Sequence, residues 1–166
     1  VKKVWPQVVK VMPEARLHVY GSNMSEAMKV RWTAVPAVEA LGYAETLAAA
    51  YGESALSICP VLRGAGSNIK VIESVAFGRL CLLTEAAARG YSDDADLRDL
   101  LPIARSATEM SEFIVHYLKN SAERNRAAQR LHQVAETKYS RQHFIDVVTQ
   151  GVSMALCRRQ KIKDRK

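Results

Sequence analysis

Residues 55–84 read ALSICPVLRGAGSNIKVIESVAFGRLCLLT, and the order of patterns within this stretch decides the fold. An apolar run at 55–61 breaks into a glycine-rich turn, and a second apolar run lies at 80–84. Continuous apolar strands are typical of a parallel sheet that is covered on both faces. Between them a helical pattern ends near Gly78, and its apolar face is expected to comprise Ile69, Ile72, Val75 and Ala76. The stretch predicts a strand–helix–strand unit.

The same alternation extends upstream of this unit. Helical spacing at 4–12 precedes a short strand, Leu17 to Tyr20, and a second strand at 37–43 precedes a short helix at 45–54. Beyond residue 106 the pattern is helical throughout. We therefore predict an α/β fold, a Rossmann-like doubly wound parallel sheet with helices on both faces and an all-helical C-terminal segment. The expected division is a domain at 1–139, followed by a helix and basic tail at 140–166.

Composition narrows the class of protein. The chain has 166 residues, of which 48% are hydrophobic and 25% charged, as in globular domains. No apolar run has the length of a membrane span, and the first residues lack the pattern of a signal peptide. Cys59, Cys81 and Cys157 show no C-x-x-C spacing, which predicts reduced thiols. Together these features predict a cytoplasmic protein.

The net charge of +7 is unevenly distributed. Residues 1–118 carry 12 basic and 13 acidic side chains, whereas residues 119–166 carry 12 basic and 4 acidic ones. The excess lies above all in RRQKIKDRK at 158–166. Two interpretations stay open for this tail, a solvated end or peripheral contact with an anionic membrane or other acidic surface. Because aromatic residues do not interleave the basic ones, we expect no nucleic-acid partner.

The glycine turn has the composition of an anion-binding loop. It follows a strand and opens a helix, where free backbone N–H groups and the helix dipole favour negative charge. Glycines allow close approach and positive φ, a polar residue can cap the helix, and cations add donors. The alternative is a tight turn that only serves packing. The residues concerned are Arg63, Gly64, Gly66, Ser67 or Asn68 as the cap, and Lys70.

Glu73 lies in the first turns of the helix that follows. A carboxylate at the ligand edge of the sheet would accept paired hydrogen bonds from a vicinal diol such as a ribose. The alternative is a surface glutamate that interacts with the helix dipole.

The stretch PVLRGAGSNIKVIESVAFGRLCLLTEAAARGY resembles the signature region of the C-terminal, donor-binding domain of GT-B glycosyltransferases, in particular the large retaining group called family 4. That family shows a strand ending in proline, a glycine loop, a helix with Glu-Ala-Met-Ala-x-Gly, a strand and a loop ending in glycine. Here the equivalents are Pro60, the loop at 64–66, the run at 73–78, the strand at 80–84 and Gly90. Looser similarity extends over residues 1–120.

The resemblance implies a transferase that uses a nucleotide-sugar, with Glu73 on the ribose hydroxyls. Gly64, Ala65, Gly66 and Ser67 would lie against the sugar and diphosphate, and Gly42 and Tyr43 near the base. It implies neither a metal nor another cofactor. Many members carry a glutamate where this chain has Ala65.

The family's donor domain normally begins with one further strand and follows an N-terminal acceptor domain. The resemblance therefore predicts that this chain is a fragment, inactive on its own. In the family the last helix crosses back to the acceptor domain. Apolar residues of that helix are thus expected to be surface that allows self-association, namely Phe144, Val147, Val148 and Val152.

Two other features of the sequence have alternative interpretations. GAGSNI followed by Glu85 some 20 residues on is also the pattern of a dinucleotide (NAD-type) oxidoreductase, although Ile69 replaces the third glycine. Asp93, Asp94 and Asp96 are expected to cap a helix rather than to hold a cation.

Overall fold

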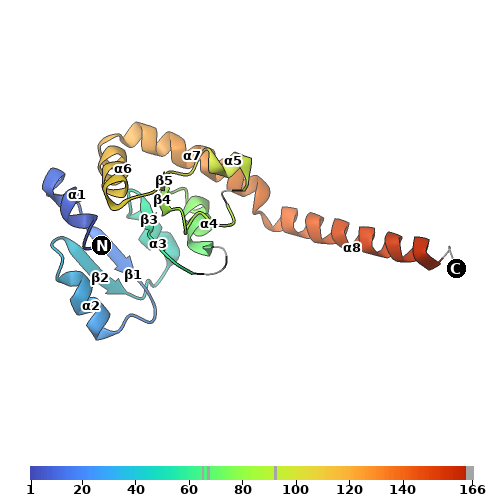
Figure 1. Ribbon diagram of the computed structural model, residues 1–166, viewed down its shortest axis with the longest axis horizontal. Coiled ribbons are helices and arrows are strands. Elements are labelled where there is room, and N and C mark those ends of the chain that lie inside the picture. The colour runs from blue at the N-terminus through green and yellow to red at the C-terminus, as the bar shows by residue number, and fades with distance from the viewer. Residues whose placement is uncertain (65, 67, 92, 164–166) are drawn as a thin grey trace.

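The computed structural model describes residues 1–64, 66, 68–91 and 93–163. Strands alternate with helices up to β5, and helices follow from there on (Figure 1). The elements are α1 (Trp5–Val11), β1 (Leu17–Tyr20), α2 (Glu26–Thr33), β2 (Val38–Gly42), α3 (Leu47–Gly52), β3 (Ser57–Cys59), α4 (Ile69–Ala76), β4 (Cys81–Thr84), α5 (Ala95–Arg98), β5 (Ile103–Ala104), α6 (Ala107–Lys119), α7 (Ser121–Lys138) and α8 (Arg141–Lys163).

The strands form two parallel sheets. β1 pairs with β2, and β3–β4–β5 form a three-stranded sheet with β4 in the centre. The predicted α/β class with parallel strands and flanking helices is confirmed. A cavity of about 450 Å³ is bordered by residues of both β1 and β3, so the facing edges of the two sheets share one hollow.

The core is centred on β4. Leu80, Leu82 and Leu83 have no exposed surface, because helices cover both faces of the central strand. α4 contributes Val71 and Val75 to the same cluster, and α6 and α7 contribute further apolar side chains. Burial of such side chains is the main favourable contribution to folding.

The buried face of α4 differs from the predicted one. Ile69 is 74% exposed, and the buried residues are Val71, Ser74 and Val75. Ile69 is two positions before Val71 and therefore lies on the opposite side of α4 from the buried residues. Gly78 does end the helix as predicted, with φ of +66° and its N–H donating to the carbonyl of Val75 at 2.9 Å.

Two elements lay outside the sequence prediction, α2 and β5. α2 begins after Ser25, whose side chain accepts from the Met28 N–H at 3.3 Å, but none of its residues is buried. Without a buried stripe it shows little apolar periodicity. β5 has only two residues, too few for any alternation.

The C-terminal helices follow the prediction. α6 packs on β4 and β5, and α7 packs on α4, α5 and α6, whereas α8 extends away from the body (Figure 1). Phe144 is 68% exposed, and Val147, Val148 and Val152 are exposed too. Among the described residues, no helix combines the length and apolar character required to cross a membrane.

Candidate functional site

The glycine loop between β3 and α4 has the expected backbone. Gly64 has φ of +149° and Gly66 of +83°, values that residues with a Cβ rarely adopt. A Cβ built on Gly66 meets no atom within 4 Å, so the loop leaves open space beside this glycine. The predicted contacts of Ala65 and Ser67 lie outside the described residues.

Asn68 has a different role from the predicted cap. It occupies the N-cap position of α4, but its side chain makes no capping hydrogen bond. Instead, Asn68 Nδ2 donates to the carbonyl oxygens of Ala86, at 3.4 Å, and Ala87, at 3.1 Å. The capping prediction is therefore wrong for Asn68, whose side chain is instead bonded through Nδ2 to the loop after β4.

That neighbouring loop also holds the glycine loop. Tyr91 Oη donates to the Asn68 carbonyl at 3.0 Å, and Arg89 Nη1 donates to the carbonyl of Gly64. The glycine loop is thus tied at both ends to the segment that follows β4. The N–H groups of the first turn of α4, which need partners outside the helix, are directed toward the carboxyl edge of the sheet.

α4 presents two of the predicted residues to the cavity between the sheets. Lys70 and Glu73 are three positions apart on one side of the helix, and both line the cavity of about 450 Å³. Glu73 is half-buried and accepts a hydrogen bond from Tyr51 Oη at 3.0 Å. A carboxylate and an ammonium group therefore face the same hollow.

The loop after β2 borders the same cavity. Gly42 ends β2 with φ of +76°, and its carbonyl accepts from the Gly21 N–H at 2.7 Å. Tyr43 is 74% exposed, and the next residue, Ala44, lines the cavity. The structure thus brings Lys70 and Glu73 to the same cavity as Ala44 of this loop, 26 and 29 residues earlier in the sequence, whereas Gly42 and Tyr43 directly precede Ala44 without lining the cavity themselves.

A larger cavity of about 690 Å³ lies at the carboxyl ends of β3, β4 and β5. It is lined by Leu62, Glu85 and Arg105 among others, and the Arg105 Nε lies 3.6 Å from Glu85 Oε1. Arg63 is exposed on the loop beside it. Size alone would favour this cavity, but the smaller one holds the carboxylate and cation that the sequence singled out, so we regard the smaller one as the candidate site.

Sequence reasoning missed Tyr51 and two apolar side chains near the loop. Leu62 is 78% exposed and Ile69 74% exposed, on either side of the glycines. Exposed apolar side chains beside a polar loop are suited to contact with a ligand or another domain. The helical pattern gave no signal for this exposure, because it assigned Ile69 to the core.

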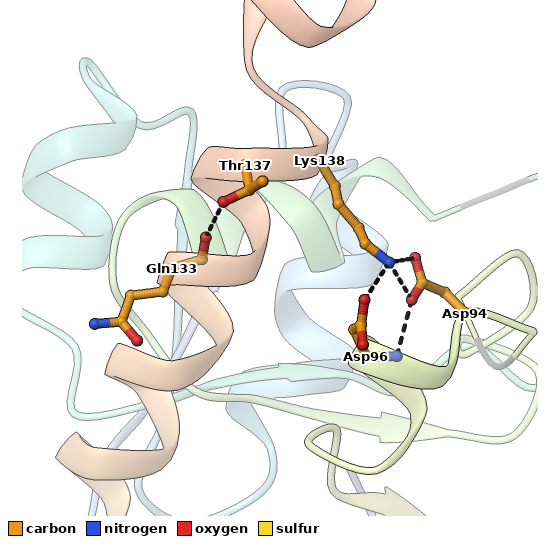
Figure 2. Close-up of polar contacts among 5 residues, drawn as sticks. All are labelled: Asp94, Asp96, Gln133, Thr137 and Lys138. Carbon is orange, nitrogen blue, oxygen red and sulfur yellow. Dashed lines mark hydrogen bonds and ion pairs between the residues drawn. The ribbon is translucent and has the colours of Figure 1, made fainter.

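The aspartates after β4 form a structural cluster (Figure 2). Asp94 caps α5 by accepting from the Asp96 N–H at 3.0 Å, as predicted. Lys138 Nζ lies 2.7 and 2.8 Å from the two carboxylate oxygens of Asp94 and 2.7 Å from Asp96 Oδ2. Hydrogen bonding from Lys138 lowers the pKa of Asp94. The cluster joins α5 to the end of α7, and the described residues contain no group of three or more side chains arranged to hold a metal ion.

Comparison with known proteins adds a family and a fold. The profile of the family described as "Glycosyl transferases group 1" matches residues 1–120. The chain is similar to the solved structure of a mutant O-GlcNAc transferase from Thermobaculum terrenum, with a TM-score of 0.65 and 16% identity over 91% of this chain. It spans only 32% of that transferase's length. Comparison with curated proteins gives no match.

Proposed function

The chain belongs to the glycosyl transferases group 1 family, and on that premise we propose that it is the donor-binding domain of a family 4 GT-B glycosyltransferase. The domain would bind a nucleotide-diphosphate sugar, whose sugar the complete enzyme passes to an acceptor. The observation that carries this proposal is the pairing of Glu73 and Lys70 on one side of α4, beside the loop after β2 and behind a glycine loop.

Each group would have a distinct role. The Glu73 carboxylate would accept a hydrogen bond from each of the two ribose hydroxyls, because its two oxygens can bind a vicinal diol. The base would lie toward Gly42 and Tyr43, whose ring is exposed. Gly64 to Ser67 would lie against the sugar and diphosphate, since glycines permit close approach.

The chemical step would depend on the charge of the leaving diphosphate. Arg63, Lys70 and the N–H groups at the start of α4 would neutralise it, because cations and a helix N-terminus stabilise negative charge. Positioning would supply the rest, with neither a protein nucleophile nor a metal. The acceptor would bind a separate N-terminal domain.

The proposal includes one more strand, parallel to β1 and β3. Strand edges carry rows of N–H and C=O groups that need partners. Between the two sheets, the cavity is bordered by β1 and β3 at its sides and by residues of α3 and α6. This arrangement fits an additional strand, which would fill the part of the cavity between β1 and β3 and join the sheets into one. The part of the cavity beside Ala44, Lys70 and Glu73 would stay open for the donor.

The exposed apolar side chains of α8 would meet the acceptor domain, or a second copy of the chain when that domain is absent. The protein would act in the cytoplasm, and the basic tail at 158–166 would allow peripheral contact with anionic lipid.

The dinucleotide alternative depends on Glu85, and the comparisons do not favour it. Glu85 lies beside Arg105 on the larger cavity, apart from Glu73. A ribose there would have to compete with a guanidinium for the carboxylate.

Titration of the protein with UDP, GDP, ADP and NAD tests the proposal, with Glu73→Ala and Glu85→Ala as a matched pair of variants. We expect preference for one nucleoside diphosphate, binding weakened by Glu73→Ala and unchanged by Glu85→Ala. Binding of NAD that is lost with Glu85→Ala would contradict the proposal.

A further inference from the structure

Tyr51 lies in the last turn of α3 and reaches across to α4. Its hydroxyl donates to Glu73 Oε1 at 3.0 Å, and both side chains line the cavity between the sheets. We propose that Tyr51 is a positioning residue that fixes the Glu73 carboxylate in the orientation that receives a nucleotide's ribose diol. This inference rests on the donor-site function proposed above.

The tyrosine is itself held in place by α4 and the turn that follows it. Its ring stacks on Phe77, with centroids 5.1 Å apart and planes inclined by 14°. Arg79 Nε donates to the Tyr51 carbonyl at 2.6 Å, and Arg79 Nη2 donates to the Gly52 carbonyl at 3.0 Å. The end of α3 is therefore fixed by the same segment that carries Glu73.

These contacts form a closed structural unit. Glu73 and Phe77 are four residues apart, hence on one side of the helix, and Tyr51 contacts both of them. The phenol has little freedom to move away, because its ring stacks on Phe77 and Arg79 holds the backbone of Tyr51 and Gly52. The hydrogen bond to Glu73 consequently orders the carboxylate before any ligand arrives.

The Tyr51 hydroxyl, which donates the hydrogen bond, remains protonated in neutral solution. Burial raises the pKa of Tyr51, and the hydrogen bond to Glu73 and the charge of its carboxylate raise it further. A neutral phenol can only donate to the carboxylate. One donor leaves most of the lone-pair positions of the two carboxylate oxygens available, enough for the two hydroxyls of a diol.

Order before binding improves affinity, because a fixed side chain loses less conformational entropy when the ligand binds. Without the phenol, Glu73 would still reach the diol but would have to be ordered at the moment of binding. The contribution of Tyr51 should therefore appear only with ligands that carry the diol.

The test compares Tyr51→Phe, which keeps the ring that stacks on Phe77, with the unaltered protein. Tyr117→Phe serves as the matched control, because Tyr117 is also a half-buried tyrosine with a pKa raised by burial and does not line this cavity. Calorimetric titration uses the preferred nucleoside diphosphate and its 2′,3′-dideoxy analogue. Thermal unfolding checks that each variant is folded.

We expect Tyr51→Phe to raise the Kd of the ribonucleotide about three- to tenfold and to leave the Kd of the dideoxy analogue unchanged. In a Glu73→Ala background the same substitution should have no further effect, as a double-mutant cycle requires of residues that act through each other. Tyr117→Phe should bind both ligands as the unaltered protein does.

The contradicting outcomes separate the two proposals. If Glu73→Ala weakens nucleotide binding but Tyr51→Phe does not, or if Tyr51→Phe weakens both nucleotides equally, the positioning role is wrong and the donor site stands. If Glu73→Ala leaves every nucleotide's affinity unchanged, the donor site and the positioning role both fail.

Discussion

The two sheets of this protein differ in how completely they are covered. In β4, three of the four residues are buried, and α4 and α6 both contribute buried side chains to the same core. In β1, half-buried residues alternate with exposed ones, and the strand contains no fully buried residue. The three-stranded sheet is thus buried on both faces at its central strand, whereas the two-stranded sheet is covered on only part of its surface.

This difference in burial indicates that the two sheets contribute differently to stability and to the candidate site. The three-stranded sheet anchors α4 through Val71 and Val75, and so fixes the helix that carries Lys70 and Glu73. The two-stranded sheet supplies the loop at Gly42 across the cavity. The candidate site therefore lies between a well-packed half and a less completely packed half.

Truncation of one side chain in each sheet should show the difference in packing most clearly. Leu82→Ala removes a side chain with no exposed surface and should lower the free energy of unfolding by about 2–5 kcal/mol. Val19→Ala in β1 removes a half-buried side chain and should cost about 1 kcal/mol or less. Denaturant unfolding measures both variants, and equal losses would show that the two sheets are packed alike.

A hydrogen bond between the buried hydroxyl of Ser74 and the half-buried hydroxyl of Ser57 ties α4 to the three-stranded sheet. Ser74 has no exposed surface, and its Oγ lies 2.6 Å from Ser57 Oγ and donates to the Arg79 carbonyl at 3.2 Å. Ser74→Ala should lower the free energy of unfolding by about 1–3 kcal/mol, because the Ser57 hydroxyl and the Arg79 carbonyl, both half-buried, each lose a hydrogen-bond partner. Ser153→Ala on exposed α8 is the control, and a loss no larger than that control's would contradict the assigned role.

The proposed additional strand offers a way to sharpen the comparison. In a longer form of the protein that carries this strand, the hydrogen-exchange rate of the β1 amides should be lower by a factor of about ten or more. This factor is equivalent to an increase of about 1.4 kcal/mol in opening free energy. Amides of β4, already paired on both sides, should change less. Hydrogen exchange followed by mass spectrometry measures both, and unchanged exchange at β1 would rule the strand out.

The smallest expected effect concerns the aspartate–lysine cluster. Lys138 lowers the pKa of Asp94 from its usual 3.8. A lowered pKa in the folded state contributes stability above the unfolded value, and this contribution is lost as pH falls through the folded value. Lys138→Met should therefore lower the Tm slightly at pH 6 and reduce the further fall of Tm below about pH 4. Parallel curves for both proteins would show that the pair contributes nothing.

Strong apolar runs and glycines made much of the fold predictable. The run at 80–84 and the glycines at 64, 66 and 78 all lie in the expected elements. α2 was missed because none of its residues is buried. Ile69 was misassigned because apolar residues lie on more than one side of α4, and their spacing does not show that Val71, Ser74 and Val75 form the buried face.

The candidate site was predictable from the sequence only where its residues are close together in the chain. Glu73 and Lys70 could be placed on one side of a helix from their spacing alone. Tyr51 lies 22 residues from Glu73, and no pattern within either helix reveals that their side chains meet. The Asn68 amide likewise bonds to carbonyls 18 and 19 residues away, a contact set by the neighbouring strand's loop.

The most direct test of the proposed donor site is to map nucleotide binding by NMR, which detects even weak complexes. The preferred nucleoside diphosphate is titrated into isotope-labelled protein while the backbone amides of both cavities are followed. We predict shifts at Glu73 and Ala44, which line the smaller cavity, and at Gly42 at the end of β2 and Gly66 in the loop after β3. Shifts confined to Glu85 and Arg105 around the larger cavity would contradict the account and move the site to the other side of the glycine loop.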